Sequence, residues 1–166
     1  TSRWPTISRW PTISSNSSSR SKGEEKEEEI IHDLTRRINI QGNRPNMHFE
    51  LALENDIPVG IAMFAIDTGT VYGLLESGYG VITGFYICPQ YRRKGYGREF
   101  FEHIQSVLIG DGAPKIYLTP DSVTGEPFWI SLGFENSGKF DPDDKKFIYI
   151  YTASAAYFRK KLFLQR

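Results

Sequence analysis

The chain has 166 residues, enough for one domain that buries roughly two thirds of the surface exposed by its unfolded form. Twenty basic and twenty acidic residues give a formal net charge of zero, so the whole chain lacks the positive charge typical of nucleic-acid and membrane-surface binders. Cys88 is the single cysteine, which excludes an internal disulfide and favours a reducing, cytoplasmic location.

Residue spacing excludes two further classes of protein. His32, His48 and His103 lie far apart in the chain and show no metal-ligand spacing, so we predict no metal site. No apolar run approaches the roughly 18 residues that a membrane-spanning helix needs. We therefore expect a soluble protein that has neither nucleic acid nor membrane as a partner.

The N-terminal segment has an unusual composition. It contains the hexamer SRWPTI twice in tandem and then a serine-rich tract. Such a composition does not form a core. It is typical of a non-native leader, while an organelle transit segment rich in arginine and serine, or a native tail, stays open. We expect residues 1–23 to be disordered or non-native, and residues 24–166 to form the domain.

The next segment has a helical pattern. Five glutamates suit the positive end of a helix, and Gly42 is the expected stop. Apolar residues follow the glutamates at helical spacing, at Ile30, Ile31, Leu34 and Ile38. No earlier strand is visible in the sequence upstream of Glu24.

Three strands are predicted next. Two short apolar runs within residues 48–67, separated by Asn55 and Asp56, predict a hairpin. The run GVITGFYI (80–87) predicts a third strand, which ends before Pro89 because proline cannot donate to a sheet ladder.

An amphipathic helix is predicted over approximately 97–109, where large apolar residues recur every three and four positions and Gly110 stops the pattern. The remaining pattern predicts a strand at 115–119, a short helix at 126–132, a strand that opens at 133–134 and a last strand at 145–152. Residues 154–166 fit either a basic amphipathic helix or a tail.

The stretch RRKGYGR (92–98) joins the third strand to the amphipathic helix. Such a junction presents unpaired backbone N–H groups at the positive end of a helix dipole, which favours anion binding. Gly95 and Gly97 would let the main chain reach positive φ and approach a ligand. The dinucleotide fingerprint does not fit, because Phe100 stands where its third glycine belongs, and neither does the P-loop pattern. A polar turn that carries four cations is the other interpretation.

The stretch FYICPQYRRKGYG resembles the acetyl-CoA motif of the GCN5-related N-acetyltransferase (GNAT) superfamily, in which an apolar strand, a proline, an arginine and two glycines follow in this order. FWISLGF (128–134) resembles the second motif of that family, and PVGIAMFAI resembles the strand that precedes the first motif. The resemblance covers approximately residues 30–152. It implies an α+β fold with a mixed, twisted central sheet flanked by helices.

The resemblance also implies a binding mode for acetyl-CoA as co-substrate. The pantetheine arm would lie along the strand backbone at 85–87, the pyrophosphate on the amides of 93–98, and the helix at 128–132 beside the thiol. A main-chain amide at or near Ile87 would polarise the thioester carbonyl. The implied cofactor-binding residues are Phe85, Tyr86, Ile87, Arg92, Arg93, Lys94, Gly95, Tyr96, Gly97, Arg98, Phe128 and Ser131.

The implied activity is transfer of an acetyl group from acetyl-CoA to a primary amine of a small molecule or peptide, by direct attack in a ternary complex. The usual acid and base of the family are missing. Thr83 and Gly84 stand where many members carry a carboxylate, and Trp129 stands at the tyrosine position. The catalytic residues therefore stay unknown; conceivable substitutes are Tyr86, Tyr149, Tyr151, Ser131 and Glu76.

Two alternatives stay open on the sequence. One is a CoA-binding module of the same fold with little or no catalysis, which the missing acid and base favour. The other is a domain that binds RNA or a phosphopeptide through the cations of 92–98. The acceptor amine is not encoded in any motif of the chain, and a homodimer is left open.

Overall fold

The computed structural model describes residues 32, 36, 39, 46–70, 72–121, 123 and 125–153. Its elements follow the chain in the order β1 (Met47–Glu54), β2 (Ile57–Ile66), β3 (Gly80–Ile87), the 3₁₀-helix η1 (Pro89–Tyr91), α2 (Tyr96–Gly110), β4 (Lys115–Leu118), α3 (Gly125–Ser131), β5 (Glu135–Asp141) and β6 (Lys146–Thr152).

Two of the predicted segments lie outside the described residues, the leader over 1–23 and the segment 154–166. Of the helix predicted before Gly42, residues 32, 36 and 39 are described, and all three are helical. The other predicted helices and strands are confirmed, with ends that differ by one or two residues.

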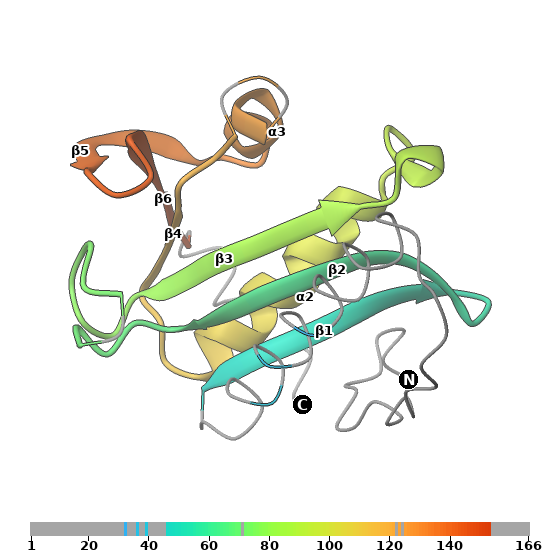
Figure 1. Cartoon of the computed structure of the whole chain (residues 1–166), viewed down its shortest axis with the longest axis horizontal. Coiled ribbons are helices and arrows are strands. Elements are labelled where there is room, and N and C mark those ends of the chain that lie inside the picture. The colour runs from blue at the N-terminus through green and yellow to red at the C-terminus, as the bar shows by residue number, and fades with distance from the viewer. Residues whose placement is uncertain are drawn as a thin grey trace, which may run out of the picture.

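The six strands form one mixed sheet in the order β1-β2-β3-β4-β6-β5. Only β3 and β4 run parallel, and the other neighbours are antiparallel. Helix α2 crosses one face of the sheet, and α3 lies on the side of β3 away from β2 and β1 (Figure 1). The α+β architecture predicted from the sequence is confirmed.

The turn between β1 and β2 follows from its two residues. Asn55 and Asp56 have φ angles of 49° and 66°. This left-handed backbone is the one that tight hairpins need, and asparagine and aspartate tolerate it better than other residues with a side chain. The turn residues thereby set the register of the hairpin.

The sheet is buried on both faces, because residues that alternate along a strand enter different clusters. Ile82 belongs to the larger cluster, which packs beneath α2, whereas Val81 belongs to a smaller cluster on the other face. Helix α2 contributes its predicted apolar stripe, in which Phe100, Ile104 and Leu108 have no exposed surface. The large cluster therefore holds the start of α2 against β2 and β3.

A polar seam also joins α2 to β1. Glu50 is only 3% exposed, and its Oε2 lies 2.6 Å from Nε2 of His103 on α2. Nε2 of His48, two residues earlier on the same face of β1, lies 2.7 Å from Oδ2 of Asp111 at the end of α2. Paired in this way, a carboxylate can be buried without leaving an unsatisfied charge.

The long connection between β2 and β3 is organised by Asp67, which is fully buried. Its carboxylate accepts hydrogen bonds from the amides of Gly69 (2.7 Å) and Gly73 (3.1 Å) and from the hydroxyl of Tyr117 on β4 (2.6 Å). Burial and the hydrogen bond to Asp67 raise the pKa of Tyr117 well above its ordinary value. These hydrogen bonds hold the loop against β4.

The sheet divides between β3 and β4. β3 pairs with β2 from Gly80 to Ile87, but its pairing with β4 consists of Gly80 with Ile116 and Val81 with Tyr117.

The described part of the chain contains no helix long and apolar enough to cross a membrane.

Candidate functional site

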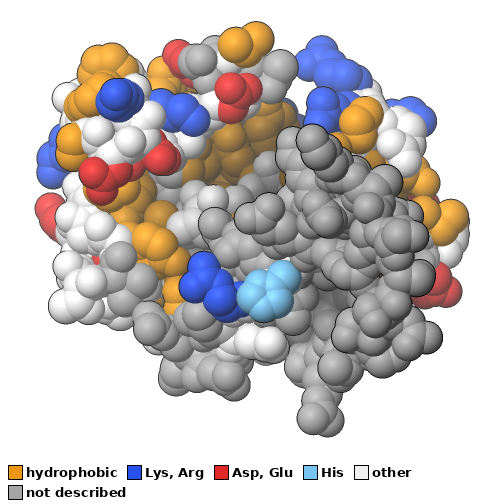
Figure 2. Space-filling model, in the orientation of Figure 1, with side chains coloured by type: hydrophobic (Ala, Val, Ile, Leu, Met, Phe, Trp, Pro, Cys, Tyr) orange, Lys and Arg blue, Asp and Glu red, His pale blue; other side chains and the backbone are white. Residues whose placement is uncertain are grey.

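A cleft of about 820 Å³ opens where β3 and β4 part. Figure 2 shows it as a hollow with a hydrophobic floor, with Lys and Arg side chains on one side of its rim and Asp or Glu side chains on another. Three segments line it: the second half of β3, the loop into α2, and the chain from the end of β4 through α3.

The β3 wall of the cleft has an irregular backbone. Met63 of β2 pairs with Gly84, and Phe64 pairs with Ile82, so Thr83 is an extra residue that forms a bulge. The hydroxyl of Thr83 donates to the carbonyl of Met63 at 3.3 Å. Beyond Val81, no described strand pairs with the edge of β3 that faces the cleft. Backbone groups along 82–87 are therefore placed to bind an extended ligand as an added strand.

The glycine loop continues directly from that edge. Gly95 caps α2 with a φ of 93°, and its carbonyl accepts the first helical hydrogen bond, from the amide of Glu99 at 3.1 Å. The amides at the start of an α-helix have no acceptor within the helix, and they lie at the positive end of its dipole. Gly95, Gly97 and Arg98 all line the cleft, so this backbone is placed to bind an anion.

The two glycines serve different purposes, and one expectation was wrong. Gly95 has the expected positive φ, but Gly97 is an ordinary helical residue, and the other positive φ of the loop belongs to Arg93, at 62°. A Cβ at Gly97 would lie 3.1 Å from two ring carbons of Phe128. Gly97 is therefore required for the close approach of α3 to α2.

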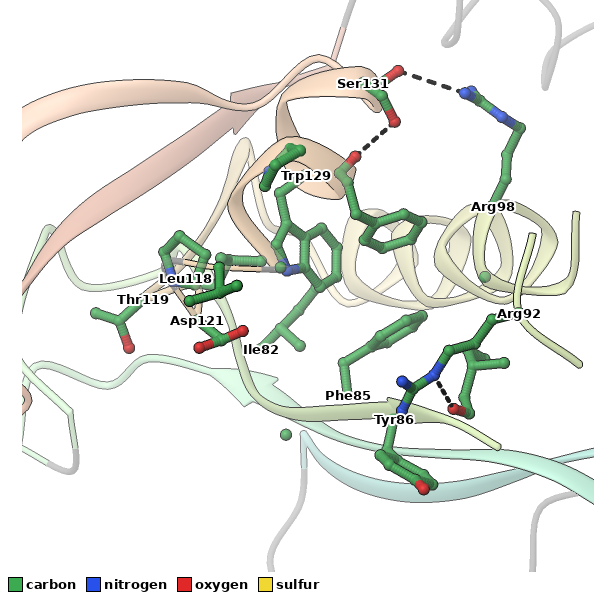
Figure 3. A pocket seen from close by; sticks show the side chains of 18 of the residues that line it. Ile82, Phe85, Tyr86, Arg92, Arg98, Leu118, Thr119, Asp121, Trp129 and Ser131 are labelled. Carbon is green, nitrogen blue, oxygen red and sulfur yellow. Dashed lines mark hydrogen bonds between the residues drawn. The ribbon is translucent and has the colours of Figure 1, made fainter. Parts of the chain in front are cut away.

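Two of the loop cations also hold the backbone in place (Figure 3). Nε of Arg92 donates to the carbonyl of Ile87 at 2.9 Å, and its guanidinium lies 5.3 Å from the ring centroid of Tyr86. Nη2 of Arg98 donates to the carbonyl of Ser131 at 3.4 Å, which links α2 to the end of α3. Both arginines keep positive charge at this end of the cleft.

The cleft brings together ten of the twelve residues expected to bind the cofactor: Phe85, Tyr86, Ile87, Arg92, Arg93, Gly95, Gly97, Arg98, Phe128 and Ser131. Lys94 and Tyr96 do not line it. Nζ of Lys94 lies 5.9 Å from the ring centroid of Tyr91, and the ring of Tyr96 packs edge-on against the same tyrosine. A contact of these two with the cofactor stays a prediction.

Helix α3 covers the cleft with aromatic side chains. The ring centroid of Phe85 lies 5.7 Å from that of Phe128 and 5.0 Å from that of Trp129. Trp129 is 5% exposed and belongs to the core. The hydroxyl of Tyr149 on β6 donates to the carboxylate of Glu126 in the first turn of α3. This hydrogen bond, together with burial, raises the pKa of Tyr149.

Of the five conceivable substitutes for the missing acid and base, Tyr86 and Ser131 line the cleft, and Glu76, Tyr149 and Tyr151 do not. The hydroxyl of Ser131 donates to the carbonyl of Phe128, and that of Tyr151 accepts from Gln105 on α2. Among the described residues, no group of three or more His, Cys, Asp and Glu side chains could hold a metal ion.

Sequence reasoning missed one wall of the cleft, which runs from the end of β4 into α3. Leu118, Thr119, Pro120, Asp121 and Val123 all line it. Ligand sites in sheets with parallel strands lie beyond the carboxyl ends of the strands. These residues directly follow β4, the strand that runs parallel to β3. The parallel pairing of β3 and β4, which are joined through α2, was therefore the signal that could have found them.

Solved structures of acetyltransferases share this fold. An acetyltransferase from Thermus thermophilus is 18% identical, with a TM-score of 0.61 over 74% of this chain and 75% of its own. The PaiA N-acetyltransferase from Thermoplasma acidophilum, solved with coenzyme A, is 15% identical, with a TM-score of 0.54 over 80% and 74%. The N-acetyltransferase YlbP from Bacillus subtilis, also with coenzyme A, is 20% identical, with a TM-score of 0.53 over 78% and 82%. At these identities the likeness shows the fold.

The family itself is shown by the sequence. No curated protein matches the chain. The model of the acetyltransferase (GNAT) family matches residues 9–134, a span that contains β1, β2, β3, the glycine loop, α2, β4 and α3. The resemblance inferred from the motifs is therefore confirmed, and the chain belongs to the acetyltransferase (GNAT) family.

Proposed function

We propose that the protein is an N-acetyltransferase that moves the acetyl group of acetyl-CoA to a primary amine, by direct attack in a ternary complex. One observation carries the proposal: the edge of β3 beyond Val81, with which no strand of the described residues pairs, leads straight into the amides at the start of α2, inside a single cleft. The membership of the acetyltransferase family and the coenzyme A held by two structural relatives support acetyl-CoA as the co-substrate.

In this proposal the pyrophosphate lies on the amides of residues 93–98, where helix dipole and arginine charge both favour an anion. The pantetheine arm pairs with the backbone of Phe85–Ile87 as an added strand. The thioester then lies deeper in the cleft, against the aromatic side chains of α3. Its carbonyl accepts a hydrogen bond from a main-chain amide at or near Ile87, which stabilises the oxyanion formed on attack.

The reaction can proceed without a conventional acid. A typical alkylamine has a pKa near ~10.4, so roughly one molecule in a thousand is neutral at pH 7. A thiol with a pKa near ~8.5 is already a fair leaving group. General acid-base assistance is typically worth ~10²–10⁴-fold, so its loss slows the reaction without abolishing it.

The second candidate function is a CoA-binding module with little or no catalysis. The residues at the three expected acid and base positions favour it: Thr83 and Gly84 carry no carboxylate, and the buried Trp129 carries no acidic hydroxyl. The domain limits at residue 24, the cytoplasmic location and a homodimer stay predictions under either function.

A thermal-shift experiment tests the cofactor. A ligand that binds only the folded state stabilises it by about 2.7 kcal/mol at 100 times its Kd. Millimolar acetyl-CoA should therefore raise the Tm by several degrees. An oligonucleotide serves as the control, because a raised Tm with the oligonucleotide and none with acetyl-CoA would overturn the proposal.

Release of free thiol from acetyl-CoA distinguishes an active enzyme from the second candidate, a CoA-binding module with little or no catalysis. The assay uses a panel of polyamines, amino acids, aminoglycosides and peptides. We expect release above background with at least one acceptor. If acetyl-CoA stabilises the protein but no acceptor leads to thiol release, the result favours the CoA-binding module without catalysis.

A further inference from the structure

The charges that line the cleft are divided between its two ends. Arg92, Arg93 and Arg98 lie at the end formed by the glycine loop. Asp121 lies at the opposite end, on the loop that follows β4, and contributes the one carboxylate among the described residues that line the cleft (Figure 3). A co-substrate with several phosphates is attracted to the first end and repelled from the second.

The position of Asp121 is fixed by the fold. Its carbonyl accepts a hydrogen bond from the amide of Glu126 at 2.8 Å, so the first turn of α3 holds the main chain. Pro120, immediately before it, is buried. Asp121 lines the same cleft as Ile82, the residue of β3 next to the bulge at Thr83, where β3 has parted from β4.

We infer that Asp121 binds the ammonium group of the acceptor, and that the acceptors are cationic amines that carry no carboxylate next to the amine. The inference rests on the proposed function, because the arginine end of the cleft has to hold the phosphates. Between the two ends lies an apolar floor that includes Phe85 and Trp129. Asp121 is itself exposed, so it attracts an ammonium and repels the carboxylate of an amino acid with a strength that added salt reduces.

The role of Asp121 in the reaction is to bind and orient the acceptor. The bound ammonium loses one proton to water, and the neutral nitrogen attacks the thioester carbon. A C–N bond forms while the electrons of the C=O bond move to oxygen, and nitrogen becomes positive. Asp121 stabilises that positive charge. The oxyanion then collapses, the C–S bond breaks, and the thiolate takes up the second proton of the nitrogen, which yields the amide and free CoA.

The test compares amines with the amino acids that differ from them by one carboxylate, tyramine with tyrosine and agmatine with arginine. The variants are Asp121→Asn, Asp121→Glu and the control Asp56→Asn, which changes an exposed aspartate at the β1–β2 turn. For the wild-type protein we expect a higher kcat/KM with the amine of each reactive pair. Asp121→Asn should lower that value roughly 10- to 100-fold, mainly through the KM of the amine. The KM of acetyl-CoA should not change.

A binding measurement makes the test independent of turnover. With saturating CoA in place of acetyl-CoA, tyramine or agmatine should raise the Tm of the wild-type protein and of Asp56→Asn, and raise that of Asp121→Asn less. Asp121→Glu keeps the charge and should keep the preference for amines over amino acids. If Asp121→Asn no longer responds to CoA, the comparison is made with Asp121→Glu and with the wild-type protein at low and high salt, where added salt should raise the KM of the amine.

Three outcomes would overturn the inference: an unchanged kcat/KM and unchanged amine binding in Asp121→Asn, a wild-type preference for the amino acid of each pair, or a KM of the amine that salt does not alter. None of these contradicts acetyl transfer itself. Conversely, if the wild-type protein binds CoA and the amine together but releases no thiol from acetyl-CoA, the proposed activity is contradicted, and weaker amine binding in Asp121→Asn still supports Asp121 as the amine-binding residue.

Discussion

The glycine loop shows how two residues of one type can be required for different physical reasons. Gly95 is needed for its backbone, since its φ of 93° is strained for any residue with a Cβ, and nothing lies within 4 Å of the place where that Cβ would be. Gly97 is needed for its lack of volume, because Phe128 fills the space beside it. Only the first requirement bears directly on the amides that face the proposed phosphates.

Replacing Gly95 with alanine separates backbone strain from ligand binding. The variant Gly95→Ala should lose about 1–3 kcal/mol of unfolding free energy, because alanine is strained at this φ. Gly112→Ala is the matched control, with a φ of 100° and equally open surroundings at the turn after α2. Urea denaturation should show similar losses for both variants, and calorimetry with CoA should show weaker binding only for Gly95→Ala. Equal CoA affinities for the two would contradict the placement of the phosphates at this loop.

At the scale of elements, α3 is a short helix whose position depends on its neighbours. It has seven residues, too few for stability on its own. Glu126 accepts from Tyr149 at its start, the carbonyl of Ser131 accepts from Arg98 at its end, and Trp129 packs into the core between them. The width of the cleft is therefore determined by contacts of α3 with β6 and α2.

Removing the hydroxyl of Tyr149 should widen the cleft. Tyr149→Phe leaves Glu126 without this donor, so the start of α3 is held less firmly, and the affinity for CoA should fall roughly 2- to 10-fold. Tyr151→Phe is the control, because it also removes one hydroxyl of β6, the partner of Gln105, but none that contacts α3. Isothermal titration of CoA distinguishes them. The same affinity in both variants would show that the hydrogen bond to Glu126 does not position α3.

At the scale of the whole molecule, two halves of the sheet meet at a narrow junction. The paired residues of β3 and β4 are Gly80 with Ile116 and Val81 with Tyr117, and the buried Asp67 holds the hydroxyl of Tyr117 at the same place. This junction permits the cleft to open on one side while the sheet stays continuous on the other.

The junction should give stability a dependence on alkaline pH. Burial and the hydrogen bond to Asp67 raise the pKa of Tyr117 above the unfolded value of 10.0, so the folded state holds this proton more tightly than the unfolded state. The resulting contribution to the unfolding free energy is complete below about pH 10 and declines as the pH rises further. In Tyr117→Phe, which has no hydroxyl to ionise, that decline should be shallower.

Denaturant unfolding at several pH values between about 8 and about 11 measures this difference. Tyr91→Phe is the control, since this partly buried tyrosine lies in η1, beyond the other end of β3. It should follow the wild-type decline. A Tyr117→Phe variant with the same slope as the wild type would contradict the role assigned to the hydroxyl.

The sequence by itself determined the local structure and the class of the site. Periodicity, turn residues and the loop between β3 and α2 predicted the six strands, α2 and α3 to within one or two residues, because these features depend on neighbours in the chain; the 3₁₀-helix η1 was not predicted. The order of Pro89, Arg92, Gly95 and Gly97 indicated the acetyltransferase family for the same reason, since main-chain binding of a phosphate needs only a short, continuous segment.

Only the tertiary structure decided which distant residues share the cleft. Asp121 entered the site because β4 pairs in parallel with β3 and then parts from it, and the role of Gly97 was decided by a side chain on α3. The side chains of Lys94 and Tyr96 pack against Tyr91 and do not line the cleft. The place of Asp121 in the cleft, and with it the inferred choice of acceptor, depends on packing between segments far apart in the chain. No local pattern of residues records such packing.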